Sequence, residues 1–191
     1  MIEIVPSSPR WAEDFAAIAA ELRAVLGDLA LRIDHIGSTS VPGLASKDRI
    51  DIQVTVRSLE HLEDIIGPLT DLGYRYAGEI AQDHLPPGWE GPEDAWRKLF
   101  FGAPPGARAI NIHVRPAGAP NQRYALLFRD YLRLHPAMAA GYAAFKRGLA
   151  AYLGDDLRSY AELKDPVCDI IMAAAEEWAD ESRWEPGPSD M

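Results

Sequence analysis

Two short segments, Ile50–Arg57 and Ile110–Arg115, alternate apolar and polar residues over their whole length. Successive side chains of a β-strand point to opposite faces of the sheet, so each segment has one wholly apolar face and one wholly polar face. The period of two predicts strands, because an α-helix repeats its faces every 3.6 residues. Any fold for this chain must therefore contain a sheet with one buried face and one polar face.

The polar faces of these two strands leave two interpretations open. In the first, the sheet is antiparallel and its polar face is exposed to solvent. In the second, Asp51 and Gln53 from one strand converge with Asn111 and His113 from the other, as a ligand or metal site requires.

Elsewhere, apolar residues at steps of three and four predict helices, and short apolar runs predict strands. Helices are expected over residues 9–26 and 59–72, then from 120 to about His135, around 138–149 and around 157–171, the last with a kink or restart at Pro166. Further strands are expected at 29–36, 74–77 and 97–101, the last forming a hairpin with 110–115, and residues 78–95 are expected to form a long loop.

This order predicts an α+β fold, with a mixed sheet, flanking helices and a helical C-terminal half. We expect one domain over residues 1–180, with an α/β part at about 1–118 and a helical part at about 119–180. Six acidic residues against one arginine lie between 176 and 191, and we expect the acidic tail 181–191 to be disordered.

Composition narrows the functional classes. Cys168 is the only cysteine, which excludes a disulfide framework and a cysteine-rich zinc site. The chain has no apolar run of membrane-helix length and no signal-peptide profile at its start, so a cytoplasmic location away from the membrane is expected. The net charge of -10 argues against non-specific nucleic-acid binding but permits a small phosphorylated ligand held by a local Lys/Arg cluster.

The stretch GSTSVPGLASK, residues 37–47, is a hydroxyl-rich turn between two predicted strands. Gly37 would allow close approach of the backbone to a ligand, and Ser38, Thr39 and Ser40 would offer hydroxyl and N–H groups to phosphate oxygens. The turn lacks the Lys-Ser/Thr of a Walker motif. The structural alternative is an N-cap for a short helical turn.

The spacing around this turn resembles the signature of the nucleotidyltransferase superfamily: Gly-Ser, about a dozen residues, then an aspartate that starts an alternating strand. In that superfamily the Gly-Ser holds nucleotide phosphates, and two carboxylates two residues apart bind divalent metal. Such a pair faces one side of a strand and can share Mg²⁺.

A closer resemblance, over nearly the whole chain, is to the GrpB family of small bacterial proteins in that superfamily, sometimes fused to dephospho-CoA kinase. It is carried by LRIDHIGSTSVPGLASKDRIDIQV, INIHV and LLFRDYLRLHPAMAAGYAAFKRGLA. The resemblance implies a nucleotidyltransferase-like core, with Gly37 and Ser38 at the phosphates and Asp51 as the first metal carboxylate. Gln53 departs from the second carboxylate, and His113 is the candidate for the third. These three residues are the catalytic candidates, with Asp51 and His113 as ligands for Mg²⁺ or Mn²⁺.

Several other groups are candidates for phosphate binding or for closing a cleft. Lys47 and Arg49 flank the turn, and Lys98 lies in the predicted strand before that of His113, although solvent exposure is the ordinary expectation for each. Lys146, Tyr160 and Lys164 lie on the late helices, where they either close the cleft or extend along the helix surfaces. His35 is either buried or a ligand. His61, His84 and His135 are expected to be structural or solvent-facing.

Three functional hypotheses follow. The first is a metal-assisted nucleotidyltransferase acting on a nucleotide and a small acceptor. The second is a non-catalytic nucleotide- or ligand-binding accessory domain that has lost the metal pair, which Gln53 favours. The third is a hydrolase of the phosphodiesterase type.

Overall fold

The computed structural model describes all residues, 1–191. Its helices are α1 (Arg10–Leu26), α2 (Glu63–Asp71), α3 (Pro120–Leu134), α4 (Pro136–Leu153) and α5 (Leu157–Ser182), and its strands are β1 (Arg32–Ile36), β2 (Ile50–Val56), β3 (Arg75–Tyr76), β4 (Leu99–Gly102) and β5 (Ile110–Pro116). Three 3₁₀ turns, η1 (Gly27–Leu29), η2 (Ser38–Ser40) and η3 (Glu93–Trp96), complete the chain. The expected α+β class and mixed sheet are confirmed.

The five strands form one sheet in the order β1-β2-β5-β4-β3. The predicted hairpin of β4 and β5 is antiparallel, but β2 and β5 are parallel neighbours. The expectation of an antiparallel sheet is therefore wrong for the two strands on which it was based. Their register places Asp51 beside Asn111 and Gln53 beside His113.

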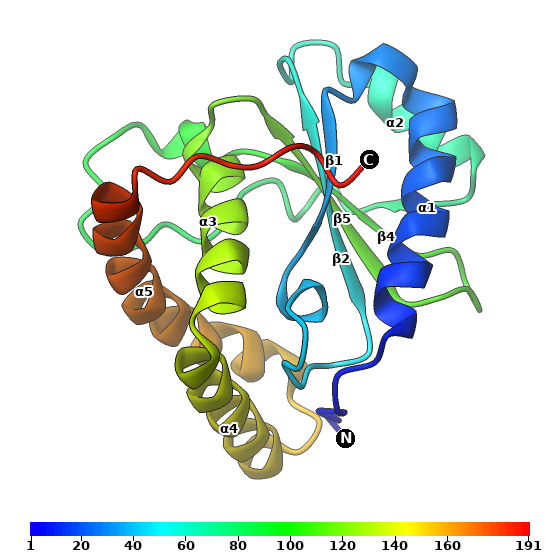
Figure 1. The fold of residues 1–191 in the computed structure, drawn as a ribbon. Helices are drawn as coiled ribbons and strands as arrows, with labels where there is room; N and C mark the ends of the chain where they lie inside the picture. The colour runs from blue at the N-terminus through cyan, green and yellow to red at the C-terminus, as the bar shows by residue number, and fades with distance from the viewer.

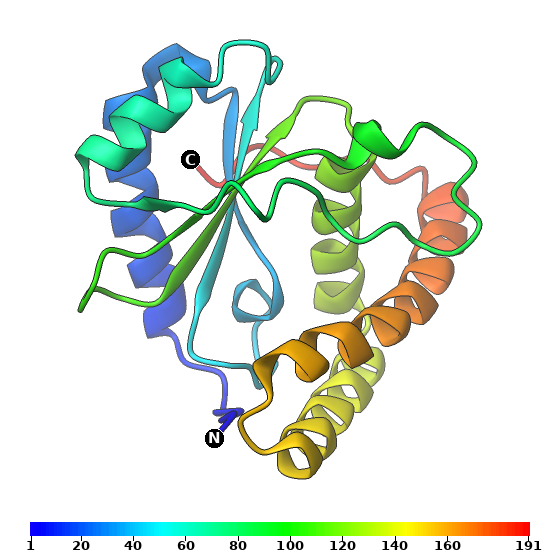
Figure 2. The ribbon, with the colours of Figure 1, turned by 180° about the vertical axis from the view of Figure 1, so that it is seen from behind.

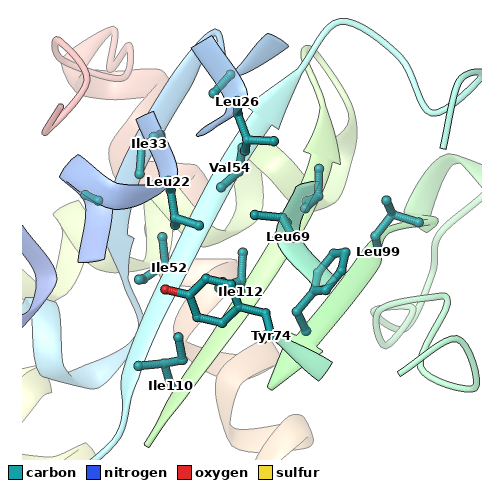
Figure 3. Packing of buried hydrophobic residues seen from close by; sticks show 14 of the residues in the cluster. Leu22, Leu26, Ile33, Ile52, Val54, Leu69, Tyr74, Leu99, Ile110 and Ile112 are labelled. Carbon is teal, nitrogen blue, oxygen red and sulfur yellow. The ribbon is translucent and has the colours of Figure 1, made fainter. Parts of the chain in front are cut away.

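Helices α1 and α2 cover one face of the sheet, and α3, α4 and α5 lie on the other side (Figure 1). The apolar faces of β2 and β5 pack under α1 and α2 in a cluster of 19 buried residues. Figure 3 shows Ile52, Val54 and Ile112 of the sheet in the same cluster as Leu22 of α1 and Leu69 of α2. Burial of this face fixes the strand register, because a slip by one residue would place the polar side chains in the core.

The polar face of the sheet lies on the side of the C-terminal helices and is not a solvent-exposed surface. Gln53 is 0% exposed and Arg115 is 5% exposed. The interpretation of a solvated polar face is therefore wrong, because the helical half covers it. A second core of 15 buried residues lies mainly between the helices of that half.

Helix α5 is continuous from Leu157 to Ser182 and contains Pro166. Figure 2 shows the helix changing direction in its first half, where Pro166 removes one backbone donor. The expected kink is thus present without a break. None of the helices is both long and apolar enough to cross a membrane.

Composition predicts a disordered tail, whereas the structure lays residues 187–191 along the outer edge of β1 (Figure 1). The Ile33 N–H donates to Ser189 Oγ at 3.0 Å, and the His35 N–H donates to the Asp190 carboxylate at 2.9 Å. Arg129 Nη1 donates to the same carboxylate at 2.9 Å. Side chains of the tail thereby satisfy backbone donors that an edge strand would otherwise leave open.

His35 is a buried, hydrogen-bonded histidine. It is 5% exposed, stacks on Phe15 with ring centroids 4.8 Å apart, and its Nε2 lies 3.0 Å from Thr39 Oγ1. Burial lowers the pKa of His35 to about 4, an effect that Asp190 opposes and Arg133 and Arg129 reinforce.

This shift predicts a pH-dependent stability. The unfolded chain, with a histidine pKa of about 6.5, binds a proton that the folded chain does not bind between pH 6.5 and 4. The contribution of neutral His35 to the free energy of unfolding is therefore fully present above pH 6.5. It falls as the pH drops towards 4, by about 3 kcal/mol in all. Urea unfolding of the wild type and His35→Gln at pH 7 and pH 4.5 measures it. Equal losses for both proteins would exclude this role of His35.

Candidate functional site

A cavity of about 520 Å³ lies between the polar face of the sheet and the helical half. Its lining comes from the turn after β1, from β2 and β5, from the loop before β4, and from α3, α4 and α5. Of the predicted site residues it brings together the following: Gly37, Ser38, Lys47, Asp51, Lys98, His113, Lys146, Tyr160 and Lys164. Asp51 and His113 thus share one face, as the alternating pattern predicts.

The turn begins at Gly37, whose backbone has φ 68° and ψ -171°. A Cβ at this position would lie 2.4 Å from Asp51 Oδ2, so the turn rests directly against the carboxylate. Both the dihedral angles and the close approach require glycine. The alternative of a side-chain N-cap is not seen, because η2 has no side-chain cap hydrogen bond.

Only Ser38 among the three hydroxyl residues of the turn lines the cavity. Thr39 Oγ1 is held by His35, and Ser40 Oγ donates to the Gly37 carbonyl at 2.6 Å. Both residues are buried. Their expected role as direct phosphate ligands is therefore not supported, and they shape the turn instead.

The chain contains four lysines, and all four line this cavity. Lys146 is 2% exposed and its Nζ donates to Ser38 Oγ at 2.8 Å. Lys98 is 6% exposed, and Lys47 Nζ lies 4.8 Å from the centroid of the buried Tyr160 ring. The interpretation of solvated or surface-lying lysines is therefore wrong for Lys98 and Lys146.

The cavity is cationic within an acidic protein. Six lysines and arginines line it, against three aspartates, whereas the chain as a whole carries -10. The cations are Lys47, Arg49, Lys98, Arg115, Lys146 and Lys164, and the acids are Asp51, Asp83 and Asp165. Such a local excess of positive charge attracts anions.

Asp83, in the long loop before β4, organises one side of the cavity. Its carboxylate accepts hydrogen bonds from Lys98 Nζ at 2.6 Å, from Arg115 Nε at 2.8 Å and from Asn121 Nδ2 at 3.0 Å. Burial alone would raise the pKa of Asp83, but the charges of Arg115 and Lys98 outweigh it and lower the pKa. Lys98 and Arg115 are therefore already paired, whereas Lys47 and Lys146 form no ion pair.

Asp51 lies at the other side of the cavity, against Gly37. Asn111 Nδ2 donates to its Oδ1 at 2.7 Å. Burial raises the pKa of Asp51, and the hydrogen bond from Asn111 and the charge of Lys47 oppose that shift. Asp51 is thus the cavity carboxylate that lies against the turn.

The residues predicted to hold a divalent metal do not fit one. Gln53 Oε1 accepts from Arg115 Nη1 at 2.6 Å, and Gln53 Nε2 donates to the Gln122 carbonyl at 3.2 Å. His113 Nδ1 lies 3.3 Å from Lys98 Nζ and 3.2 Å from Arg115 Nη2. Burial, then these two cations, lower the pKa of His113 well below its usual value.

No group of three or more His, Cys, Asp or Glu side chains is arranged to hold a metal ion. One carboxylate among several cations is a poor donor set for Mg²⁺ or Mn²⁺, which prefer several oxygen ligands. Asp51 and His113 thus line the same cavity, but the groups around them are not those found around metal ligands.

Two buried polar atoms on residues that line the cavity have no hydrogen-bond partner in the protein. They are Trp96 Nε1 and Asn121 Oδ1. Asn121 Nδ2 is fixed by Asp83 and by the Trp96 carbonyl, so the amide cannot turn to satisfy its oxygen. Buried polar groups are ordinarily paired, so the end of the cavity away from Ser38 holds one donor and one acceptor that lack hydrogen-bond partners.

Fold and site together define an α+β protein with a cationic cavity between its sheet and its helical half. A family model described as GrpB protein matches residues 1–174, and the chain belongs to the GrpB family. The crystal structure of the conserved protein GrpB from Enterococcus faecalis has a TM-score of 0.76 and 30% identity, covering 92% of this chain and 99% of that chain.

Two curated relatives extend this result. UPF0157 protein PA4798 of Pseudomonas aeruginosa is 37% identical over 177 residues, covering 91% of this chain and 67% of that protein. A dephospho-CoA kinase of Mycolicibacterium paratuberculosis is 34% identical over 197 residues, covering 97% of this chain and 48% of that protein. The chain thus spans about half the length of the dephospho-CoA kinases it matches.

Proposed function

We propose that this chain binds a small phosphorylated molecule of nucleotide size in the cationic cavity, with lysines rather than a metal ion neutralising the phosphate charge. The observation that carries the proposal is the position of all four lysines around one cavity. Lysine is almost never buried unless its charge is compensated. An anionic ligand would supply that compensation for Lys47 and Lys146, which have no ion-pair partner, whereas Lys98 is paired with Asp83 and Lys164 with Asp165.

The phosphate end is assigned to the side of the cavity with Ser38. Lys146 there donates to Ser38, whereas Lys98 on the far side is paired with Asp83. Lys47 and Lys164 also line the cavity: Lys47 Nζ lies over the Tyr160 ring, and Lys164 Nζ lies 3.2 Å from Asp165 Oδ1. A phosphate beside Ser38 would therefore meet the amino groups of three lysines from three separate segments of the chain.

This proposal argues against the metal-assisted nucleotidyltransferase. Two-metal catalysis needs carboxylates that share the ions, and here Gln53 is engaged with Arg115. The resemblance of the Gly37-Ser38 turn to a phosphate-binding turn supports an anion at this position.

Calorimetric titration with ATP and pyrophosphate at pH 6.5, once in EDTA and once in Mg²⁺, tests the proposal. We expect binding in EDTA, and we expect Lys146→Met and Lys164→Met each to weaken it at least about tenfold, which is about 1.4 kcal/mol. In this proposal both lysines contact the phosphate directly.

Arg147→Met is the matched control. It removes the same charge one residue further along α4, from an exposed side chain, and should leave the affinity within about twofold, which is about 0.4 kcal/mol. An equal loss of affinity in this control would show that the effect comes from the net charge of the protein. Binding that appears only with Mg²⁺ would overturn the metal-free proposal.

A further inference from the structure

Ser38 and Lys146 form a hydrogen-bonded pair of side chains inside the cavity, beside Tyr142. The distance between Ser38 Oγ and Lys146 Nζ is 2.8 Å, within the range in which a serine proton can be transferred to an amine. Lys146 comes from α4 and is 2% exposed, so its position is set by packing rather than by solvent. The Ser38 side chain is not engaged with the backbone of its own turn, unlike that of Ser40.

We propose that Ser38 is a nucleophile, activated by Lys146, that accepts a phosphoryl group from the bound ligand. The substrate class, a phosphate ester or anhydride, rests on the proposed function of the cavity. The nucleophilic character of Ser38 rests on the geometry of the pair and can be tested separately.

The steps balance with water as the only further reactant. Neutral Lys146 takes the Ser38 proton as the Oγ–P bond forms and the bond from phosphorus to the leaving oxygen breaks, and the Lys146 ammonium then protonates that oxygen. In the second step water gives a proton to Lys146 and attacks phosphorus, and Ser38 leaves and recovers the proton. The net result is hydrolysis, and an acceptor alcohol in place of water gives transfer.

The surroundings of Lys146 favour its neutral form. Burial lowers the pKa of Lys146 to about 7, and the charge of Lys164 adds to the effect. A lysine in this range is half neutral near physiological pH, as a general base requires. The charged and titratable groups around it are Lys47 before β2, Asp51 on β2, Lys164 and Cys168 on α5, and Tyr142 on α4. Lys146 Nζ lies over the Tyr142 ring, 4.5 Å from its centroid.

Labelling with diisopropyl fluorophosphate tests the nucleophile without knowledge of the substrate. The reagent forms an Oγ–P bond with loss of fluoride, and intact mass spectrometry with peptide mapping locates the adduct. We expect one adduct per chain, on Ser38, forming faster as the pH rises through about 7 because Lys146 loses its proton there.

Ser38→Ala should abolish the adduct, and Lys146→Met should slow its formation at least about 100-fold. Lys146→Arg keeps the charge but cannot accept a proton at these pH values, so it should be equally slow even if the methionine variant folds poorly. Ser46→Ala is the control, because Ser46 lines the same cavity without contacting Lys146, and it should label at the wild-type rate.

Two results would overturn the proposal. One is a wild type that carries no adduct between pH 6 and 9, and the other is an adduct on Ser38 that forms at the same rate in both Lys146 variants. A wild type that binds pyrophosphate but remains unlabelled removes the nucleophile and leaves the binding function intact. A wild type that does neither removes both.

Discussion

Replacing Asp83 by alanine is expected to lower the free energy of unfolding by about 3–5 kcal/mol. The Asp83 carboxylate compensates the buried charges of Lys98 and Arg115, each with a side chain only 6% exposed. Without it these two cations remain buried close together, which costs more than the attraction that is lost. Urea unfolding at pH 7 measures the change.

Glu79→Ala is the control, because it removes the same charge from an exposed position of the same loop. It should change the free energy of unfolding by less than about 0.5 kcal/mol. Asp83→Asn keeps the shape and should still cost most of the alanine value, since the charge is what Lys98 and Arg115 need. A small effect of both Asp83 substitutions would show that the loop is not held by this network.

Gly37→Ala is expected to destabilise the protein by at least about 3 kcal/mol. An alanine at φ 68° and ψ -171° is strained, and its Cβ would lie 2.4 Å from Asp51 Oδ2. The carboxylate must then move away from Asn111, so the site should lose its ligand as well as its stability. Thermal unfolding and pyrophosphate titration of the same variant measure the two effects.

Gly43→Ala separates the two causes. Gly43 also has a positive φ, of 80°, but a Cβ there would meet nothing within 4 Å. It should cost only the backbone strain, about 1–2 kcal/mol, and leave binding unchanged. Equal losses at both glycines would mean that contact with Asp51 contributes nothing.

The alternation of apolar and polar residues was sufficient to predict β2, β5 and their two faces, because residues two apart on a strand point to the same face. It carries no information on strand direction. The chain leaves β2 and returns in β5 after α2, β3 and β4, and this path makes the two neighbours parallel. Nor does alternation tell whether a polar face meets water or helices.

For related reasons, the sequence predicted some residues of the candidate site and missed others. The Gly37-Ser38 turn and Asp51 are local features of spacing, and the structure brings them together. Asp83 was missed because its loop, rich in glycine and proline, has no periodicity that marks an inward side chain. Arg115 was recognised only as part of a polar strand face. The chain has only four lysines, and this small number was the one sequence signal that they belong to a common site.

The polar face of the sheet also has a consequence for how the chain folds. All five strands lie between Arg32 and Pro116, so the sheet and the helices α1 and α2 can assemble while the later helices are still being synthesised. Exposed apolar surface makes such intermediates prone to aggregation. Here the face that waits for the helical half carries aspartate, glutamine, asparagine, histidine and arginine, so the half-made protein presents a hydrophilic surface until α3, α4 and α5 cover it.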